Sequence, residues 1–289
     1  MSATLTAAPA RAAPRLHLTV GLLALPLILL LAVVYFYPVA GTLADSVRLP
    51  NFGLQQYRHL LESPVYMEVM ARTFWLAVFV TVTTAVVGYP VAFYLTVASP
   101  GLARVALFLL FVPFWASTVV RTYGLMVILG RTGIVNSLLL ALGLADRPVQ
   151  FLFNAATVRV AMVQILLPFF VLPLYAVLRT IDRSLLQAAL GLGARPWQLF
   201  RTVYLPLSMP GVFAGGLMVF VFSFGFFITP ALLGGRREVT IAMLIMAQFE
   251  GELDWGFGAA LSVVLLVVSL TAMLLAARVA GTGRVGIHG

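Results

Sequence analysis

The chain has 289 residues, of which 62% are hydrophobic and 9% are charged, whereas soluble domains carry about a quarter charged residues. It contains no cysteine, and its formal net charge of +9 comes from arginine alone, because lysine is absent. This composition indicates an integral membrane protein and excludes disulfides and a P-loop ATPase, which needs a lysine. Basic charge in such a chain normally serves membrane orientation, so we expect no nucleic-acid partner, and three widely separated histidines predict no metal site.

Apolar runs that match the roughly 20 residues needed to cross a bilayer recur along the chain. After a tail over residues 1–15 that is predicted to be disordered, six spans are expected at residues 16–40, 72–98, 104–130, 158–178, 209–233 and 257–277. Polar stretches at 41–70, 131–154 and 234–255 are expected to contain short helices, at 137–144 and 240–249 in the last two. We therefore predict an all-α integral membrane protein with one transmembrane domain over residues 16–289.

A polar segment over residues 182–206 separates the fourth and fifth predicted spans. Residues 184–187, Ser-Leu-Leu-Gln, fit a capping box, which predicts that a helix starts at Ser184. Gly191 and Gly193 can take the positive φ that ends a helix, and Pro196 fits the first turn of another. The sequence therefore predicts two short amphipathic helices outside the membrane that need a surface to pack against.

Polar side chains inside a membrane span are costly, so each one is a functional hypothesis. Arg121 would cost about 2.5–3.5 kcal/mol at a helix centre, and it either reaches the outer interface or lines a cavity. Aromatic faces in the fifth span could attract a cation, although ordinary helix packing explains them as well. The candidate residues of a translocation path are Trp115, Ser117, Arg121, Tyr123, Gln164, Phe224, Phe227 and Thr229.

Acidic residues are absent from the deep parts of all six predicted spans. A carrier driven by protons or sodium would need relay carboxylates there, so this alternative is weakened. Glu250, Glu252 and Asp254 instead gather beside Trp255, just before the sixth span. Such a group at the mouth of a bundle would suit an amine substrate or a docking protein, or it is simply a solvated loop.

The orientation of the chain in the membrane does not follow from its arginines. Six spans place nine arginines on each side, so the positive-inside rule gives no preference. Eight of the nine acids lie on one side, but acids contribute little to that rule.

Several blocks of the sequence resemble a known family. Residues of the 182–206 segment are similar to the "EAA…G…LP" loop of the inner-membrane permease subunits of binding-protein-dependent ABC importers, in which this loop is a coupling helix docked on an ATPase. Residues 112–136, 167–182 and 223–235 look like the first permease subunit of spermidine/putrescine importers, so the resemblance covers most of a core over residues 70–280. The coupling positions that it implies are Gln187, Ala188, Ala189, Gly193, Leu205 and Pro206, with Gln187 where the family usually has Glu.

The resemblance implies a type I importer permease with six transmembrane helices and a cytoplasmic coupling helix, in the bacterial inner membrane with both termini in the cytoplasm. It implies a second permease subunit, two ATPase subunits that carry ATP and Mg, and a periplasmic or surface-anchored solute-binding protein. This chain would then be a non-catalytic subunit without a cofactor, and its solute a polyamine such as spermidine or putrescine. Two alternatives stay open: an anionic or other small organic solute, or a carrier or channel that needs no ATPase.

Overall fold

The computed structural model describes residues 14–49 and 52–282. The tail predicted to be disordered lies outside these residues, except for Pro14 and Arg15, which belong to the first helix. The described residues form helices joined by turns, without a strand among them, so the all-α class is confirmed.

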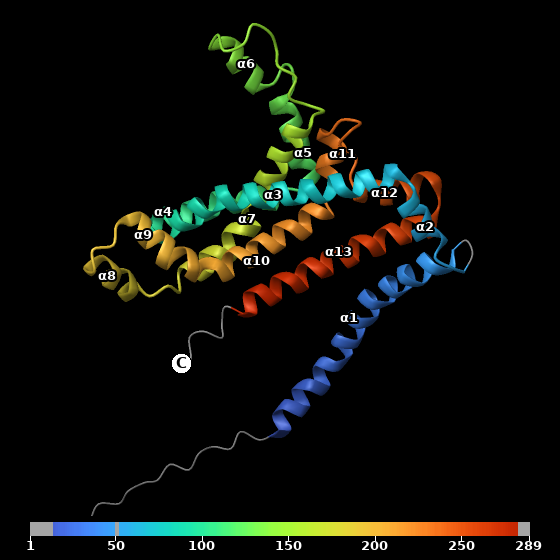
Figure 1. Cartoon of the computed structure of the whole chain (residues 1–289), viewed down its shortest axis with the longest axis horizontal. Helices are drawn as coiled ribbons and strands as arrows, with labels where there is room; N and C mark the ends of the chain where they lie inside the picture. Colours follow the sequence, from blue (N-terminus) through green and yellow to red (C-terminus); the bar gives the residue numbers. More distant parts are fainter. Residues whose placement is uncertain (1–13, 50–51, 283–289) are drawn as a thin grey trace, which may run out of the picture.

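The helices follow one another along a single bundle with two side arms (Figure 1). They are α1 (Pro14–Arg48), α2 (Gln55–Glu62), α3 (Pro64–Val97), α4 (Pro100–Phe111), η1 (Val112–Trp115), α5 (Thr118–Leu129), α6 (Ile134–Ala141), α7 (Ala155–Leu178), α8 (Arg183–Gly191), α9 (Pro196–Leu199), η2 (Phe200–Tyr204), α10 (Leu205–Phe224), α11 (Ile228–Leu233), α12 (Ile241–Met246), η3 (Ala247–Glu252) and α13 (Trp255–Thr282).

Six segments of the described chain are long and apolar enough to cross a membrane, as predicted. They are Leu25–Arg48, Pro64–Val97, Thr118–Ala141, Ala155–Leu178, Pro196–Phe224 and Trp255–Arg278. Several helices extend beyond the predicted spans, because hydropathy marks only the apolar part of a helix that continues into the interface. α1 thus continues to Arg48, and α3 begins at Pro64, a residue that suits the first helical position.

Helices α3, α7 and α10 pack along one another and form the core of the bundle. Phe170 of α7 is fully buried at their contact. A Cβ on Gly88 of α3 would lie 2.6 Å from Phe170 Cδ1, and a Cβ on Gly215 of α10 would lie 2.7 Å from the Phe170 carbonyl oxygen. Glycine at these two positions therefore makes room for Phe170 and lets the three helices approach closely.

The remaining helices cover the sides and ends of this core. α13 packs against α10 and α1, while α8 and α9 extend from one end of the bundle and α2 and α12 lie at the other (Figure 1). At that second end, Leu60, Ile241, Phe257 and Leu261 form a separate hydrophobic cluster. The apolar centre of the polar stretch at 234–255 thus folds inward as a short helix, as the sequence predicts.

The third predicted span, over residues 104–130, is not one helix. The chain breaks between η1 and α5, where Ala116 is extended and Ser117 caps α5 by accepting a hydrogen bond from the Val119 amide at 3.2 Å. Pro113 lacks a backbone N–H, which weakens the helix just before the break. The hydropathy pattern does not register this interruption, because apolar residues continue through it.

The fifth predicted span, over residues 209–233, is also divided. α10 ends at Phe224, residues 225–227 are not helical, and α11 then forms a short helix of its own. Gly225 ends α10, and Pro230 cannot donate to a helix that would run through this point. The short helix predicted at 137–144 is present as α6, although it begins at Ile134. The third candidate span runs from Thr118 to Ala141 and includes α6, so it differs from the predicted span at 104–130 and from a stretch that leaves the spans at residue 131.

Candidate functional site

The 182–206 segment begins with a capped helix, α8. Asp182 is its N-cap, and the Asp182 carboxylate accepts a hydrogen bond from the Ser184 amide at 2.8 Å. The predicted start at Ser184, with Gln187 completing a capping box, is therefore wrong. Hydrogen bonds from Ser184 lower the pKa of Asp182 below its ordinary value, and a carboxylate at a helix N-terminus is further favoured by the helix dipole.

We expect Asp182→Ala to loosen the first turn of α8, whereas Asp182→Asn keeps an acceptor for the Ser184 amide. Hydrogen–deuterium exchange of residues 184–187 measures the difference. Because the folded pKa is lowered, the cap of the native protein is fully formed above the ordinary pKa of an aspartate and is lost as the pH falls through the folded value. The native protein, but not Asp182→Asn, should lose protection in that acid range; identical pH profiles would contradict this role.

Gly193 ends α8 in the way that its sequence position predicts. Its φ is +81°, its amide donates to the Leu190 carbonyl at 2.9 Å, and the Ala194 amide donates to the Ala189 carbonyl at 3.1 Å. This pair of bonds is the Schellman motif, which places glycine at the left-handed position. Gly191, in contrast, remains within α8.

The second short helix predicted in this segment is not separate. α9 continues through the π-helical turn η2 directly into α10, so Pro196–Phe224 forms one long candidate span. Leu205 and Pro206 are consequently the first residues of α10. The wide turn falls just before Pro206, where the missing N–H already interrupts the regular hydrogen-bond ladder.

An exposed group of apolar residues lies on α8, α9 and their turn. It consists of Leu185, Leu190, Leu192 and Trp197, and we call it the apolar end patch. Leu192 is 89% exposed. It lies outside the apolar spans, at the end of the bundle from which α8 and α9 extend (Figure 1), so lipid tails are not expected to cover it. Exposed apolar side chains that gather outside the apolar spans make this end of the bundle a candidate for contact with another protein. The family loop motif does not include these positions, but the apolar spacing along residues 185–192 signals them.

The residues of the family loop motif take different positions relative to this patch. Gln187 lines a cavity of about 510 Å³ between α8 and the ends of α3 and α7, together with Thr96, Arg179 and Tyr204. Ala188 is exposed on α8, and Ala189 is half-buried. Gln187 is itself exposed, so its side chain is accessible to another molecule as well as to this cavity.

Two candidate path residues, Arg121 and Gln164, line one cavity inside the bundle. This cavity of about 310 Å³, the Arg121 cleft, is bounded by α4, η1, α5 and α7, and its other lining residues include Phe114 and Pro168. The Arg121 Nη2 donates to the Thr118 hydroxyl at 3.3 Å, and its Cζ lies 5.7 Å from the centroid of the Phe114 ring. Of the two possibilities for Arg121, the structure therefore favours the cavity.

The other candidate path residues are not brought to this cleft. Phe224 is fully buried, Phe227 is half-buried, and the Thr229 hydroxyl lies 3.2 Å from the Thr122 hydroxyl, which joins α11 to α5. Trp115 is 91% exposed, and Tyr123 is exposed on α5. Within this chain, Phe224 and Thr229 serve packing, whereas Trp115 and Tyr123 are available to another molecule.

The acidic group lies at the end of the bundle opposite α8 (Figure 1). The Asp254 carboxylate accepts a hydrogen bond from the Phe257 amide at 2.9 Å and so caps α13, and Glu252 accepts from the Gln248 side chain at 2.9 Å. Glu250 is exposed, and the Trp255 ring packs on Phe249 at a centroid distance of 5.3 Å. Two of the three acids thus have structural partners, and Glu250 is left for solvent or a ligand.

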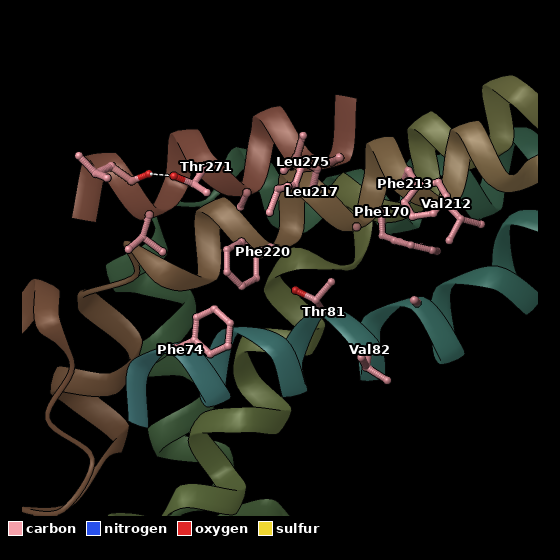
Figure 2. A pocket seen from close by; sticks show the side chains of 16 residues that line it. Phe74, Thr81, Val82, Phe170, Val212, Phe213, Leu217, Phe220, Thr271 and Leu275 are labelled. Atoms are coloured by element: carbon pink, nitrogen blue, oxygen red, sulfur yellow. Dashed lines mark hydrogen bonds between the residues drawn. The ribbon is translucent and has the colours of Figure 1, made fainter. Parts of the chain in front are cut away.

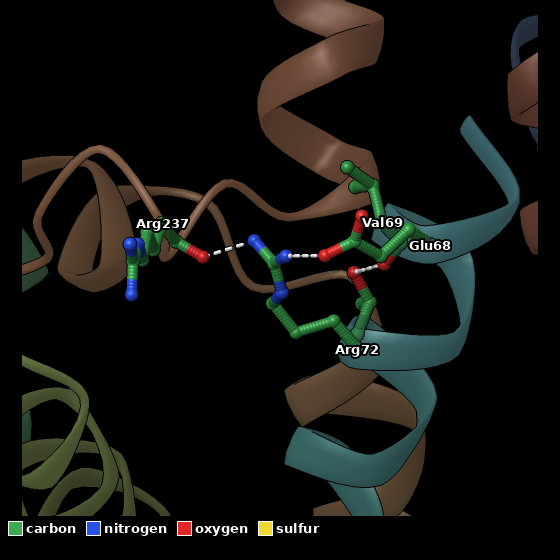
Figure 3. A network of polar contacts seen from close by, with 5 residues as sticks. Glu68, Val69, Arg72 and Arg237 are labelled. Carbon is green, nitrogen blue, oxygen red and sulfur yellow. Dashed lines mark hydrogen bonds and ion pairs between the residues drawn. The ribbon is translucent and has the colours of Figure 1, made fainter. Parts of the chain in front are cut away.

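An arginine outside the predicted site residues holds the loop before α12 (Figure 3). Arg72 of α3 donates to the Arg237 carbonyl and pairs with Glu68 one turn earlier. Nearby, the Thr73 hydroxyl accepts a hydrogen bond from the Ile241 amide at 3.0 Å. These contacts fasten α12 to α3 and thereby fix the position of the acidic group that follows. Only the tertiary structure reveals the pairing, because Arg72 and Arg237 are far apart in sequence.

A large apolar cavity of about 560 Å³ lies between α3, α10 and α13 (Figure 2). Its hydroxyl groups are occupied, since Thr81 donates to the Ala77 carbonyl and Thr271 to the Val267 carbonyl, both at 2.7 Å. The rest of its wall consists of apolar side chains such as Phe74, Phe220 and Leu275. This cavity therefore offers hydrocarbon contacts and no free group for a charged solute.

Comparison with known proteins agrees with this architecture. Residues 73–281 match the family model of the binding-protein-dependent transport system inner membrane component. The chain is 40% identical over 217 residues to the spermidine/putrescine transport system permease protein PotB of Escherichia coli strain K12, which covers 75% of this chain and 78% of that protein.

Two solved structures share the fold. A bacterial ABC transporter involved in the import of the acidic polysaccharide alginate matches 93% of this chain and 96% of its own with a TM-score of 0.75 and 20% identity. A bacterial alginate ABC transporter in complex with an alginate pentasaccharide-bound periplasmic protein matches 91% and 94% with a TM-score of 0.74 and 18% identity. The chain thus belongs to the family of binding-protein-dependent transport system inner membrane components and is the multi-pass permease subunit of an ABC importer.

Proposed function

We propose that this chain is one of two permease subunits of an importer for polyamines such as spermidine or putrescine, driven by ATP hydrolysis on separate ATPase subunits. The similarity to PotB supports the choice of solute. The absence of lysine supports a separate motor, which would bind ATP and Mg. A periplasmic or surface-anchored solute-binding protein would deliver the solute, by analogy with the alginate transporter in complex with a pentasaccharide-bound periplasmic protein.

The apolar end patch carries the coupling part of this proposal. Its leucines and Trp197 are exposed apolar side chains at one end of a membrane bundle, and they would fit a groove on an ATPase. This end then lies in the cytoplasm, together with both termini, and the acidic group lies on the side where the solute arrives. Trp115 and Tyr123 are exposed and Arg121 lines its cleft, so these three residues would face the solute path.

The function is tested at Gly193 in proteoliposomes that contain the complete importer. Gly193→Val is expected to reduce substrate-stimulated ATP hydrolysis several-fold, because a β-branched residue at φ +81° is strained by about 1–2 kcal/mol. A steric clash does not contribute to the expected loss, since a Cβ at residue 193 would meet nothing within 4 Å. Gly193→Asn is the matched control, because asparagine tolerates this conformation, and it should keep most of the stimulation. Unchanged coupling in the valine variant would refute the role of this segment.

A second solute class is favoured by one observation, the guanidinium of Arg121 in its cleft. An anionic organic solute could pair with this charge, whereas a polyamine would be repelled by it. Binding of spermidine and of a phosphonate to the importer's solute-binding protein separates the two. Transport by the purified chain alone would instead overturn the whole proposal in favour of a carrier or channel.

A further inference from the structure

Arg121 is incompletely satisfied within this chain. Its Nε is buried and has no hydrogen-bond partner among the described residues, and within them its Nη2 reaches only the Thr118 hydroxyl. The charge is partly removed from water and faces a cleft lined mainly by apolar side chains. A charged group inside a membrane protein normally pairs with another charge or with carbonyl groups. Arg121 therefore needs an acceptor that the described residues do not supply.

Acids elsewhere in the described chain do not fill this need. The six candidate spans contain only Asp45 and Glu68, both near the ends of their helices, and Glu68 is already paired with Arg72. The remaining described acids lie in the connecting stretches, and helices α4, α5 and α7 around the cleft carry none. The acceptor must come from another molecule.

The face of α5 beside Arg121 is exposed and is not covered by other described helices. α5 packs on α11 through Thr122, but Val120, Tyr123 and Val127 form an exposed stripe at the three- and four-residue spacing of a helix face, and Val127 is 72% exposed. A Cβ on Gly124, within the stripe, would meet nothing within 4 Å. A small residue in such a stripe permits close approach of another membrane helix.

We propose that a membrane helix of the second permease subunit packs on this stripe and places a carboxylate against Arg121. The proposal rests on the proposed function, since it needs a second permease subunit. Charge complementarity selects this occupant, because a lipid tail would cover the apolar stripe but would leave the charged guanidinium of Arg121 without an anionic partner. The pair also neutralises the charge in the Arg121 cleft, so a polyamine can pass it without net repulsion.

The first test measures assembly of the complex, and not transport alone. The affinity-tagged chain is purified with its partner subunits from the host membrane. Arg121→Met keeps an unbranched side chain but removes its charge, and it should lower recovery of the second permease subunit on the order of tenfold, because the partner's carboxylate is left unpaired. Arg121→Lys should retain part of the recovery. The variant chain expressed alone should keep the native elution profile and melting temperature, which excludes misfolding.

The second test locates the partner helix. The chain contains no cysteine, so Val127→Cys carries a single benzophenone probe. Val86→Cys, 67% exposed on a part of α3 without charged residues, is the matched control. The probe at residue 127 should cross-link to a segment of the second permease subunit that contains an Asp or Glu, and the control should not label that segment. Replacing that acid with arginine should restore assembly to Arg121→Glu.

Each other outcome overturns the proposal. Full assembly of Arg121→Met with loss of transport alone would show that Arg121 binds the solute. Cross-links to lipid only, or to a segment without an acid, would exclude the pair. If no second permease subunit is recovered even with the native chain, the proposed function itself has failed, and this result is distinct from a defect confined to the Arg121 variants.

Discussion

Gly215→Ala is expected to destabilise the bundle strongly, although it adds a single methyl group. The new Cβ would lie 2.7 Å from the Phe170 carbonyl oxygen and 3.0 Å from its Cα, and both are backbone atoms of α7 that cannot rotate away. The helices must therefore separate, at a cost of about 1–3 kcal/mol for such overpacking. Gly215→Val should abolish the folded fraction, measured as the monodisperse peak in size-exclusion chromatography after a heating series.

The neighbouring glycine provides the control. A Cβ on Gly216 would meet only Thr81 Cγ2, at 3.7 Å, which is an ordinary contact. Gly216→Ala should thus leave the melting temperature unchanged or raise it slightly, because alanine favours a helix over glycine. Equal melting temperatures of the two alanine variants would show that α7 and α10 are not as closely packed as described.

Asn136→Leu is expected to release the connection between α6 and α7. Asn136 is fully buried, and its Nδ2 donates to the carbonyls of Gly130 at 2.9 Å and Val149 at 3.0 Å, while its Oδ1 accepts from the Val149 amide at 2.7 Å. Leucine has a similar volume but leaves these groups unpaired, at about 1–3 kcal/mol for each buried one. Limited proteolysis between residues 142 and 150 should become much faster.

Ser137→Ala is the matched control for this variant, because Ser137 is adjacent and exposed. Its cleavage rate should equal that of the native protein. Protection of Asn136→Leu equal to the native level would show that the three hydrogen bonds do not hold this stretch in place.

The number of spans and the position of α7 follow from the sequence, because the thickness of the bilayer core sets the length of an apolar run that can cross it, and this length is visible locally in the sequence. The breaks at Ser117 and Gly225 do not follow from it. Both lie within runs of apolar residues, and each break is stabilised by contacts with other helices, such as that between Thr122 and Thr229. Hydropathy alone therefore gives the spans without their interruptions.

The candidate site residues also divide into those that the sequence predicts and those that depend on the tertiary structure. Gly193 is predictable because its left-handed turn depends only on neighbouring residues. Whether Arg121 lines a cavity, and whether Phe224 faces a path or the core, depends on helices that are distant in sequence. The path residues and the coupling positions therefore remain predictions that the proposed experiments test.

The contact at Phe170 has a mechanical consequence for the 182–206 segment. α7 leads into α8 at one end of this segment, and α9 leads through η2 into α10 at the other. These two helices are locked together where Gly215 meets Phe170. A displacement of α8 would therefore be passed to α7 and α10 together, because these two helices are closely packed at Gly215. The break at Ser117, in contrast, lies outside this packed pair of helices.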